Sequence, residues 1–328
     1  MQKILVTWWA GYIWSHTVHY LISQWINPNQ IVVFDNLIYG HKEYLPQWVI
    51  FIKWDLLNKK EIFECIEKHQ IDSVIHFAAY AYVWESMENP WKYFENNIVW
   101  WLNLLEWMVK YWVKYIVFSS TCATYGIPEL MPISESTPQK PINPYWESKL
   151  MFEKILDWYD KIHWIRSVRL RYFNAAWAEF WIWENHNPET HIIPLVIEAA
   201  LWKRDNIKIF WDDYDTPDWT NIRDYIHVKD LWDAHFKALK YLECWWKTDY
   251  FNLWTWIWTS VKEIVDLVRK ISWKDFKVIV EWRRPWDPDS LVADNRKAID
   301  VLWRKITKSM EETISDAYSW AKTLYNSL

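Results

Sequence analysis

The chain has 328 residues, enough for one large domain or two smaller ones, and its 37 basic and 42 acidic side chains leave a net charge of −5. A balance this close to neutral offers no basic face for nucleic acid, and no run of about 18 residues lacks polar side chains, which excludes a membrane-spanning helix. The three cysteines are too few and too scattered for a disulfide framework or a zinc site, and a strand-like run begins directly after Met1, so we expect a reduced, cytoplasmic protein without a signal peptide.

Glycine and tryptophan occur in unusual numbers. Glycine occurs 3 times, where roughly 23 would be usual for this length, and tryptophan occurs 32 times. Several tryptophans stand where a turn needs glycine: Trp8 and Trp9 follow an apolar run, and Trp219 follows Asp218. A ring forced into a tight turn would cost about 1–3 kcal/mol, and a total stability of about 5–15 kcal/mol could not absorb many such sites.

We therefore hypothesise that the functional protein carries glycine at most of these positions. Some bacterial lineages read the codon UGA as glycine, and a translation that reads UGA as tryptophan would write this sequence. UGG codons would instead mark genuine tryptophans, as in an aromatic binding surface. Trp91 and Trp320 stand in helix-like settings where an aromatic residue is ordinary.

The first half of the chain alternates short apolar runs with helix-length stretches. The predicted strands are residues 3–7, 31–34, 49–53, 73–77, 115–119 and 167–170. The predicted helices between them are residues 12–25, 59–69, 90–111 and 144–162. This alternation predicts βαβ units, a parallel sheet and right-handed connections.

The second half is less regular. It has proline-containing loops and amphipathic helices that we predict at residues 227–242, 260–271 and 309–326. We expect a boundary near residue 175, with later segments free to cross back to the first domain.

The opening loop after the first predicted strand has the spacing of a phosphate-binding turn. With glycine restored at Trp8, Trp9 and Trp14, it reads T-G-G-A-G-Y-I-G and contains G-x-x-G-x-x-G around Gly11. Glycines let the backbone approach a pyrophosphate, and the helix that follows supplies amide donors at its N-terminus. The pattern predicts a Rossmann-type dinucleotide site, although a tryptophan at position 8 would block the turn.

Asp35 ends the second predicted strand, 24 residues after Gly11. That offset is typical of a carboxylate that binds the adenosine ribose hydroxyls. An acidic residue there favours NAD over NADP, whose 2′-phosphate it would repel. The alternative is an ordinary turn residue at a strand end.

Tyr145 and Lys149 form a Y-x-x-x-K pair on a predicted helix, so their side chains share one face. A nearby ammonium, together with a cationic nicotinamide, would favour the phenolate and lower the pKa of Tyr145. The alternative is an exposed helical pair. A hydroxyl from Ser119, Ser120 or Thr121, at the end of the preceding strand, would complete a hydride-transfer site.

The chain resembles the extended short-chain dehydrogenase/reductase superfamily over nearly its whole length, and within it the UDP-glucose 4-epimerase family. The motifs are the opening loop, His76-Phe77-Ala78-Ala79, Val83-Trp84-Glu85-Ser86, Asn96-Asn97, Ser119-Ser120-Thr121, Tyr145 with Lys149, Arg171-Tyr172-Phe173-Asn174, residues 221–228 and residues 283–288. Tryptophans stand where that family usually has glycine at positions 8, 9, 14, 54, 84, 100, 146, 177, 211, 254, 256 and 286.

The resemblance implies an α/β fold, a doubly wound parallel sheet with a smaller α/β C-terminal domain: residues 1–175 would bind NAD and residues 176–328 the UDP-sugar. It also implies reversible 4-epimerisation of UDP-glucose and UDP-galactose through a 4-keto sugar. Tyr145 would take the proton of the 4-hydroxyl while the C4 hydride passes to tightly bound NAD. Thr121, preferred to its two serine neighbours because of the resemblance, would orient or relay this proton, and Lys149 would bind the nicotinamide ribose and tune Tyr145.

By the same resemblance, two further groups of residues would hold the ligands. The NAD contacts would be Gly11, Tyr12, Ile13, Asp35, Asn36, Asp55, Leu56, Phe77, Ala78, Asn96, Lys149 and Phe173. The UDP-sugar contacts would be Thr121, Tyr145, Asn174, Arg223, Arg284, Asp287 and Leu291. Arginine suits the phosphate oxygens. The resemblance also implies a homodimer.

Several alternatives stay open. Leu291 replaces a tyrosine found in some members and leaves room for N-acetylated sugars, and a UDP-pentose epimerase is also consistent. A 4,6-dehydratase is disfavoured because no carboxylate follows Thr121, and genuine tryptophans would leave a non-catalytic nucleotide-sugar binder. We expect no metal, because His76 and His227 lack partners at ligand spacing. The apolar helix at residues 103–111 could be a dimer face or ordinary core.

Overall fold

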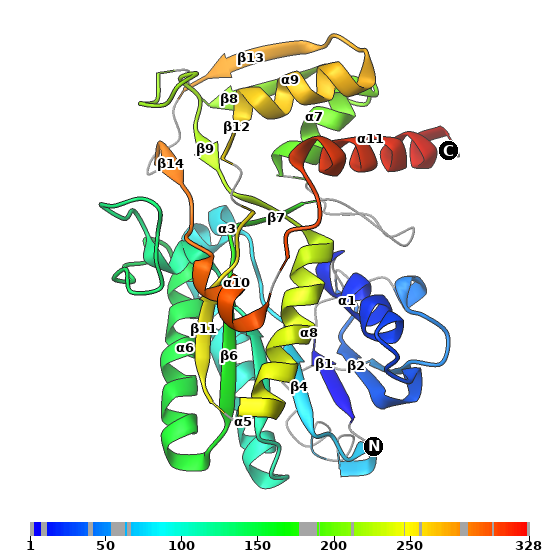
Figure 1. Ribbon diagram of the computed structural model, residues 1–328, viewed down its shortest axis with the longest axis vertical. Coiled ribbons are helices and arrows are strands. Elements are labelled where there is room, and N and C mark those ends of the chain that lie inside the picture. Colours follow the sequence, from blue (N-terminus) through cyan, green and yellow to red (C-terminus); the bar gives the residue numbers. More distant parts are fainter. Residues whose placement is uncertain are drawn as a thin grey trace.

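The computed structural model describes residues 3–7, 12–38, 42–53, 63, 67–176, 189, 191–210, 213–245, 247–255, 258–282, 288–303 and 305–326. Within them, a large lobe is built on one seven-stranded sheet, and a smaller lobe of helices and short strand pairs lies above it in Figure 1. None of the helices in these ranges has both the length and the apolar character needed to cross a membrane.

The strands of the large sheet all run parallel. In spatial order they are β11 (Asp249–Asn252), β6 (Arg166–Arg171), β5 (Tyr115–Ser119), β4 (Ser73–His76), β1 (Ile4–Thr7), β2 (Ile31–Asp35) and β3 (Ile50–Lys53). The strand order reverses between β1 and β4, so the chain winds outward in both directions from the middle of the sheet. The predicted doubly wound Rossmann-type sheet is confirmed.

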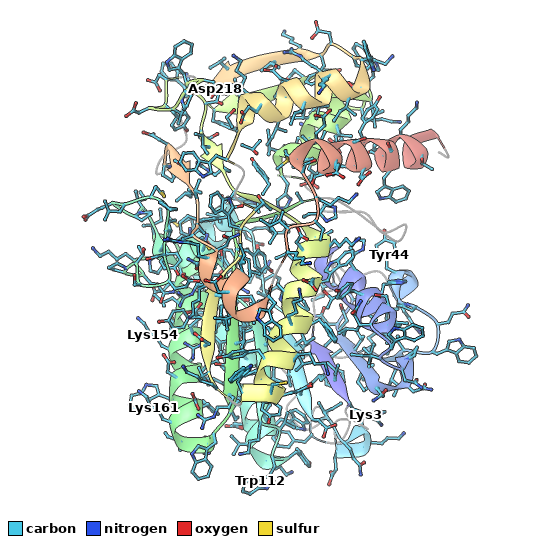
Figure 2. All side chains as sticks on the ribbon, in the orientation of Figure 1. Lys3, Tyr44, Trp112, Lys154, Lys161 and Asp218 are labelled. Atoms are coloured by element: carbon cyan, nitrogen blue, oxygen red, sulfur yellow. The ribbon has the colours of Figure 1, made fainter. Side chains whose placement is uncertain are left out.

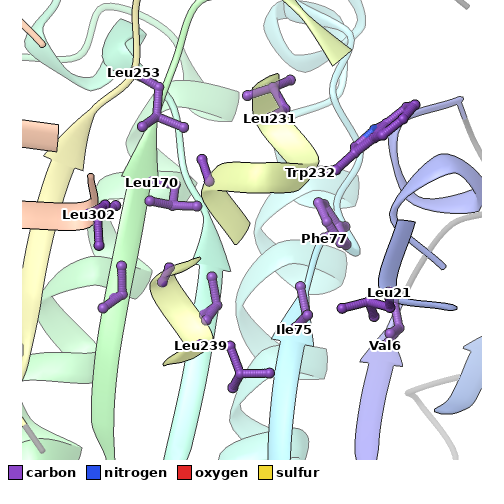
Figure 3. Close-up of a cluster of buried hydrophobic side chains, with 14 of the residues drawn as sticks. Val6, Leu21, Ile75, Phe77, Leu170, Leu231, Trp232, Leu239, Leu253 and Leu302 are labelled. Atoms are coloured by element: carbon purple, nitrogen blue, oxygen red, sulfur yellow. The ribbon is translucent and has the colours of Figure 1, made fainter. Parts of the chain in front are cut away.

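Helices cover both faces of this sheet. Those of the large lobe are α1 (Tyr12–Ser23), α3 (Val83–Glu88), α4 (Pro90–Phe94), α5 (Trp100–Lys110), α6 (Pro144–His163), α8 (Val228–Trp245) and α10 (Arg296–Leu302). On one face, Val6 and Ile75 pack with Leu21 of α1 and Leu239 of α8 (Figure 3). Alternate strand residues such as Leu5 point to the other face, where α5 and α6 lie.

The smaller lobe has its own buried cluster between three helices and two short strands. Its elements are α7 (Ile192–Ala200), α9 (Val261–Ser272), α11 (Met310–Asn326), β8 (Asn206–Phe210) and β13 (Lys277–Glu281). Short strands lie between the two lobes, namely β7 (Asn174–Ala176), β9 (Ile222–Arg223), β10 (Tyr225–His227), β12 (Thr259–Ser260) and β14 (Ser290–Leu291). The carboxyl ends of the large sheet therefore face these short strands.

The predicted elements agree closely with this structure. All six predicted strands are present, and the predicted helices at 12–25, 144–162, 227–242, 260–271 and 309–326 form within two or three residues of their expected ends. The helix predicted at 59–69 lies mostly outside the described residues. The segment that carries α8 and β11 does cross back to the large lobe, while a domain boundary near residue 175 stays a prediction.

The predicted helix at residues 90–111 is one continuous but irregular stretch. It contains α4, a π-helical turn (Glu95–Val99) and α5. The apolar side chains that could have formed a dimer face, among them Leu104, Leu105 and Met108, are buried in the core. The ordinary-core interpretation of residues 103–111 is therefore the one that the structure supports.

Tryptophan dominates the positions with left-handed backbone conformation. Ten described residues other than glycine have positive φ, and eight of them are Trp25, Trp48, Trp112, Trp164, Trp202, Trp219, Trp273 and Trp303. Six of these eight come directly after a helix or within two residues of its end. Glycine is the usual residue just after a helix because it alone adopts this conformation without a Cβ clash.

The indoles at these eight positions all point to solvent, from 58% exposed at Trp164 to 97% at Trp25. Figure 2 shows Trp112 at the lower end of the molecule, where the chain turns from α5 to β5. The expected cost of ring clashes is therefore absent here. The cost is in the backbone instead, about 1–2 kcal/mol for each residue, so the eight together rival a whole domain's stability. This supports the hypothesis that these residues are glycine in the functional protein.

Two exposed tryptophans of α6 test this interpretation. We expect Trp164→Gly, at the left-handed position after the helix, to stabilise the protein by about 1 kcal/mol. Trp158→Gly, inside the helix, should instead destabilise it by about 0.5–1 kcal/mol. The two side chains are matched at 58% and 61% exposed. Urea unfolding midpoints measure both, and equal losses of stability would contradict the glycine hypothesis.

Candidate active site

The candidate site lies at the carboxyl edge of the large sheet, where the strand order reverses between β1 and β4. Ligands of doubly wound sheets bind at this point. The last residues of the two strands are joined by a hydrogen bond of 2.5 Å between Thr7 Oγ1 and His76 Nδ1. Burial, and then Lys149, lower the pKa of His76 well below its usual value, so this imidazole is neutral.

At the neighbouring strand end, Asp35 and Asn36 form a turn after β2. Asp35 Oδ1 accepts a hydrogen bond from the Leu37 amide at 2.5 Å, and Asn36 Oδ1 accepts one from the Ile38 amide at 3.1 Å. Asp35 is buried. The turn that we considered as the alternative role of Asp35 is thus present, and it uses one of the two carboxylate oxygens.

Residues just after β4 complete this part of the edge. The Phe77 ring packs into the core against His235, with 4.5 Å between ring centroids, so it faces away from the edge. The Ala78 carbonyl accepts a hydrogen bond from Trp101 Nε1 at 2.6 Å. Of Phe77 and Ala78, it is therefore the backbone that lies toward the sheet edge.

Asn96 offers a buried polar atom to a ligand. The π-helical turn brings both Asn96 and Asn97 inward, at 2% and 0% exposed. Asn96 Nδ2 donates to Asn97 Oδ1 at 2.6 Å, but Asn96 Oδ1 has no hydrogen-bond partner among the described residues. Leaving such an atom unsatisfied costs about 1–3 kcal/mol. The unpartnered Asn96 oxygen therefore fits a polar cofactor, because a hydroxyl or amide group of the cofactor would donate the missing hydrogen bond.

Helix α6 positions Tyr145 and Lys149. The helix begins at Pro144, and the Asn143 side chain caps it by accepting a hydrogen bond from the Trp146 amide at 2.9 Å. Lys149 is 4% exposed, and its ammonium donates to the Ser119 carbonyl at 2.8 Å. The pair is therefore not the exposed helical pair that we considered as the alternative.

Burial perturbs both titrating groups. It lowers the pKa of Lys149 to about 7, although Glu153 acts in the opposite direction. It raises the pKa of Tyr145, with a smaller contribution from Tyr172. Tyr145 stays a phenol unless a further cation lies close by, and its hydroxyl has no hydrogen bond to another described residue.

The structure distinguishes the three hydroxyls after β5. The Ser119 hydroxyl is hydrogen-bonded to the Tyr172 hydroxyl, and Ser120 Oγ donates to Glu153 at 2.5 Å. Thr121 Oγ1 only accepts, from the Ala123 amide at 3.1 Å, so its proton is uncommitted. This favours Thr121 over the two serines on grounds independent of family resemblance. Thr121 and Tyr145 both lie among the described residues, and no hydrogen bond joins them.

The loop after Thr121 includes one of the three glycines. Thr121 caps a single 3-10 turn (Cys122–Tyr125), and Gly126 ends it with φ 70°. A Cβ at Gly126 would lie 1.9 Å from the Lys140 carbonyl oxygen, so no other residue fits here. The glycine keeps this loop folded tightly beneath the site.

The predicted sugar-binding residues come from the strands between the lobes. Arg223 and Leu291 are register partners in the parallel β9–β14 pair. Leu291 is buried in a cluster with Cys122, against which Phe173 packs, so this strand pair reaches the Thr121 loop. Asn174 Nδ2 donates to the Asp224 carbonyl at 3.0 Å.

Some predicted site residues are not placed. Tyr12 and Ile13 open α1, and only their backbone is described. The predictions that lie outside the described residues are Gly11, Asp55, Leu56, Arg284 and Asp287.

Two buried residues beside the site were missed at the level of sequence. Glu153 and Arg171 form an ion pair at 2.5 Å, at 2% and 4% side-chain exposure. The available signal was a charged residue four positions after Lys149, on the same helical face. We had noted Arg171 only as part of a motif.

Comparisons with known proteins agree with this geometry. Residues 4–253 match the model of the NAD dependent epimerase/dehydratase family. The chain is 45% identical over 323 residues to a UDP-glucose 4-epimerase of Streptococcus mutans, covering 97% of this chain and 96% of that one. A crystal structure of a UDP-glucose 4-epimerase is similar with a TM-score of 0.95 and 41% identity, covering 99% of each chain. Another from Brucella ovis, in complex with NAD, has a TM-score of 0.92 and 40% identity over 97% of each chain.

Proposed function

The chain belongs to the NAD dependent epimerase/dehydratase family, and from this premise we propose that it interconverts UDP-glucose and UDP-galactose by inverting C4 of the sugar. The observation that carries the proposal is a pair of uncommitted hydroxyls, on Tyr145 and Thr121, together with a buried Lys149 ammonium that lies on the same face of α6 as Tyr145 and donates to the strand end that precedes Thr121. A phenol and a cation on one helical face, next to a strand-end hydroxyl, are suited to proton transfer from an alcohol.

In this mechanism Tyr145 removes the proton of the sugar 4-hydroxyl and returns it after the keto sugar has turned over. NAD, when bound near Asp35, Asn96 and Lys149, would supply the redox chemistry as a reversible hydride acceptor for C4. Lys149 stabilises the phenolate of Tyr145 and binds the nicotinamide ribose. The Thr121 hydroxyl donates a hydrogen bond to the reacting oxygen and orients it, without transferring its own proton.

The same proposal assigns the binding residues. Asp35 and Asn96 would hold NAD, the latter through the side-chain oxygen that lacks a donor. Arg223 and Asn174 would hold the UDP half of the substrate, where a guanidinium suits phosphate oxygens. The remaining predicted contacts keep the roles given by the resemblance.

A UDP-N-acetylhexosamine is the second candidate substrate. Leu291 is buried beside the Thr121 loop and is smaller than the tyrosine found at this position in some members. This leaves volume for an acetamido group at C2 of the sugar. Both substrates would use the same Tyr145 chemistry.

Turnover of the purified protein tests the proposal. We expect UDP-galactose to convert to UDP-glucose without an added reductant, and we expect denaturation of the protein to release NAD. Chromatography of the nucleotide sugars and absorbance of the released cofactor measure the two. UDP-N-acetylglucosamine is assayed in parallel. Bound nucleotide sugar without conversion would instead identify a non-catalytic binder.

Removal of the Tyr145 hydroxyl gives a second prediction. Tyr145→Phe should lower kcat by about 10²–10⁴-fold, which is the usual contribution of a general acid–base group. NAD release should be unchanged, because the ring and the helix remain. Tyr159→Phe, on the same helix but more than three turns away, is the control and should keep full activity. Normal turnover by Tyr145→Phe would remove this residue from the mechanism.

We propose a homodimer formed through α6. Exposed apolar side chains along this helix support it, namely Met151, Trp158 and Ile162. We expect sedimentation at about twice the mass of the 40.5 kDa chain. The double variant Met151→Glu, Ile162→Glu should sediment as a monomer. Val280→Glu, an equally exposed apolar site on β13, serves as the control, and a wild-type monomer would refute the proposal.

A further inference from the structure

Helix α6 carries a third polar side chain on its catalytic face. Tyr145, Lys149 and Glu153 follow one another at intervals of four residues, so they lie along one stripe of the helix. Glu153 is 2% exposed and Lys149 is 4% exposed. A carboxylate buried this completely costs several kcal/mol unless other groups compensate for it, and the mechanism above gives it no role.

The Glu153 carboxylate is fully surrounded by donors. Arg171 donates to it through Nε at 3.0 Å and Nη2 at 2.5 Å, and Ser120 Oγ donates at 2.5 Å. Gln139 Nε2 lies at 3.4 Å. Burial raises the pKa of Glu153, but Arg171 outweighs it, so the net pKa lies below the usual value and the group is a carboxylate at neutral pH.

The two charges of α6 hold consecutive residues at the end of β5. Lys149 donates to the Ser119 carbonyl, and Glu153 accepts from the Ser120 hydroxyl. The next residue is Thr121, whose hydroxyl is the free proton donor of the site. A shift of the helix along this strand end would change the spacing between Thr121 and Tyr145.

We propose that Glu153 is a positioning residue for the epimerisation, which fixes the end of β5 against α6 and places a negative charge one helical turn from the Lys149 ammonium. The proposal rests on the proposed function. Arg171 neutralises the carboxylate and also donates to the Tyr125 hydroxyl at 2.7 Å, so the anchor extends into the loop that carries Thr121.

The charges around Lys149 support the second half of this role. Burial brings the pKa of Lys149 down to about 7, and Glu153 is the group that raises it. Three other titratable groups in this region are neutral, namely His76 from β4, Tyr145 one turn earlier, and Tyr172 after β6. Arg171 of β6, and beyond it Arg169, carry positive charges that face Glu153. Removal of the Glu153 charge would therefore release the Lys149 proton at a lower pH.

The pH profile of kcat for UDP-galactose conversion tests this in Glu153→Gln. Turnover needs charged Lys149, so the alkaline limb reports loss of its proton. We expect the alkaline limb of the kcat profile to shift to a pH roughly one unit lower, with KM little changed. Glu153→Asp keeps the charge and should restore the wild-type limb. An unmoved limb in a folded Glu153→Gln protein would overturn the charge role.

The chain offers a matched control one helical turn further on. Asp157 of α6 pairs with Arg169 of β6 at 2.6 Å, as Glu153 pairs with Arg171. Asp157 is 50% exposed and does not contact β5 in the described contacts. Asp157→Asn should leave both kcat and the alkaline limb as in wild type, and a limb shifted equally in this variant would contradict a specific role for Glu153.

Two further measurements keep the outcomes distinct. Ser120→Ala preserves the ion pair and hence folding, and we expect it to lower kcat by about 10-fold without moving the limb. An unchanged kcat would overturn the positioning role even if Glu153→Gln fails to fold. NMR titration of isotopically labelled Lys149 in the cofactor-free protein should show the same downward shift in Glu153→Gln. That readout needs no turnover, so it separates failure of this inference from failure of the proposed function.

Discussion

The fold depends on a backbone constraint at the ends of its helices. In a parallel sheet every strand must begin at the same edge, so each helix must return the chain to that edge over a short connection. This chain does so with left-handed residues: Trp25 leads to β2, Trp112 to β5, Trp164 to β6, Trp202 to β8 and Trp273 to β13. A residue without a Cβ makes such a turn at least strain. Tryptophan adopts the left-handed conformation only with backbone strain, and it occupies this position in one turn after another.

The reversal of strand order then determines where the chemistry lies. The chain continues from β1 and from β4 toward opposite edges of the sheet, and the carboxyl ends of these two strands face the short strands between the lobes. Polar groups gather there from separate segments: Asp35 after β2, Thr121 after β5 and Lys149 from α6. Most of them are buried, and burial accounts for the shifted pKa values of Lys149 and Tyr145.

Sequence patterns predicted the elements of this fold better than its contacts. Runs of four or five mostly apolar residues, spaced by helix-length stretches, predicted all six strands, because buried parallel strands are rich in apolar residues. Thr121 could not be separated from Ser119 and Ser120 by spacing, since only their partners, Tyr172 and Glu153, distinguish them. Trp219 was recognised as a turn position from the preceding Asp218, and it does have positive φ. The left-handed tryptophans that follow helices were not located, because such a residue is recognisable only once the helix end is known.

The turn at Trp164 and the catalytic face of α6 are mechanically connected. From this turn, α6 and β6 run side by side and are joined by three ion pairs: Asp160 with Arg166, Asp157 with Arg169, and Glu153 with Arg171. Each pair further from the turn uses an earlier residue of α6 and a later residue of β6. The geometry of the turn therefore sets the register of all three ion pairs. The last pair is the most buried, and it is hydrogen-bonded to Ser120 and Tyr125 on either side of Thr121. Of the three pairs, only Glu153 with Arg171 contacts the residue that precedes Thr121, so the two outer pairs hold α6 against β6 while the inner pair fixes the spacing on which Thr121 and Tyr145 depend.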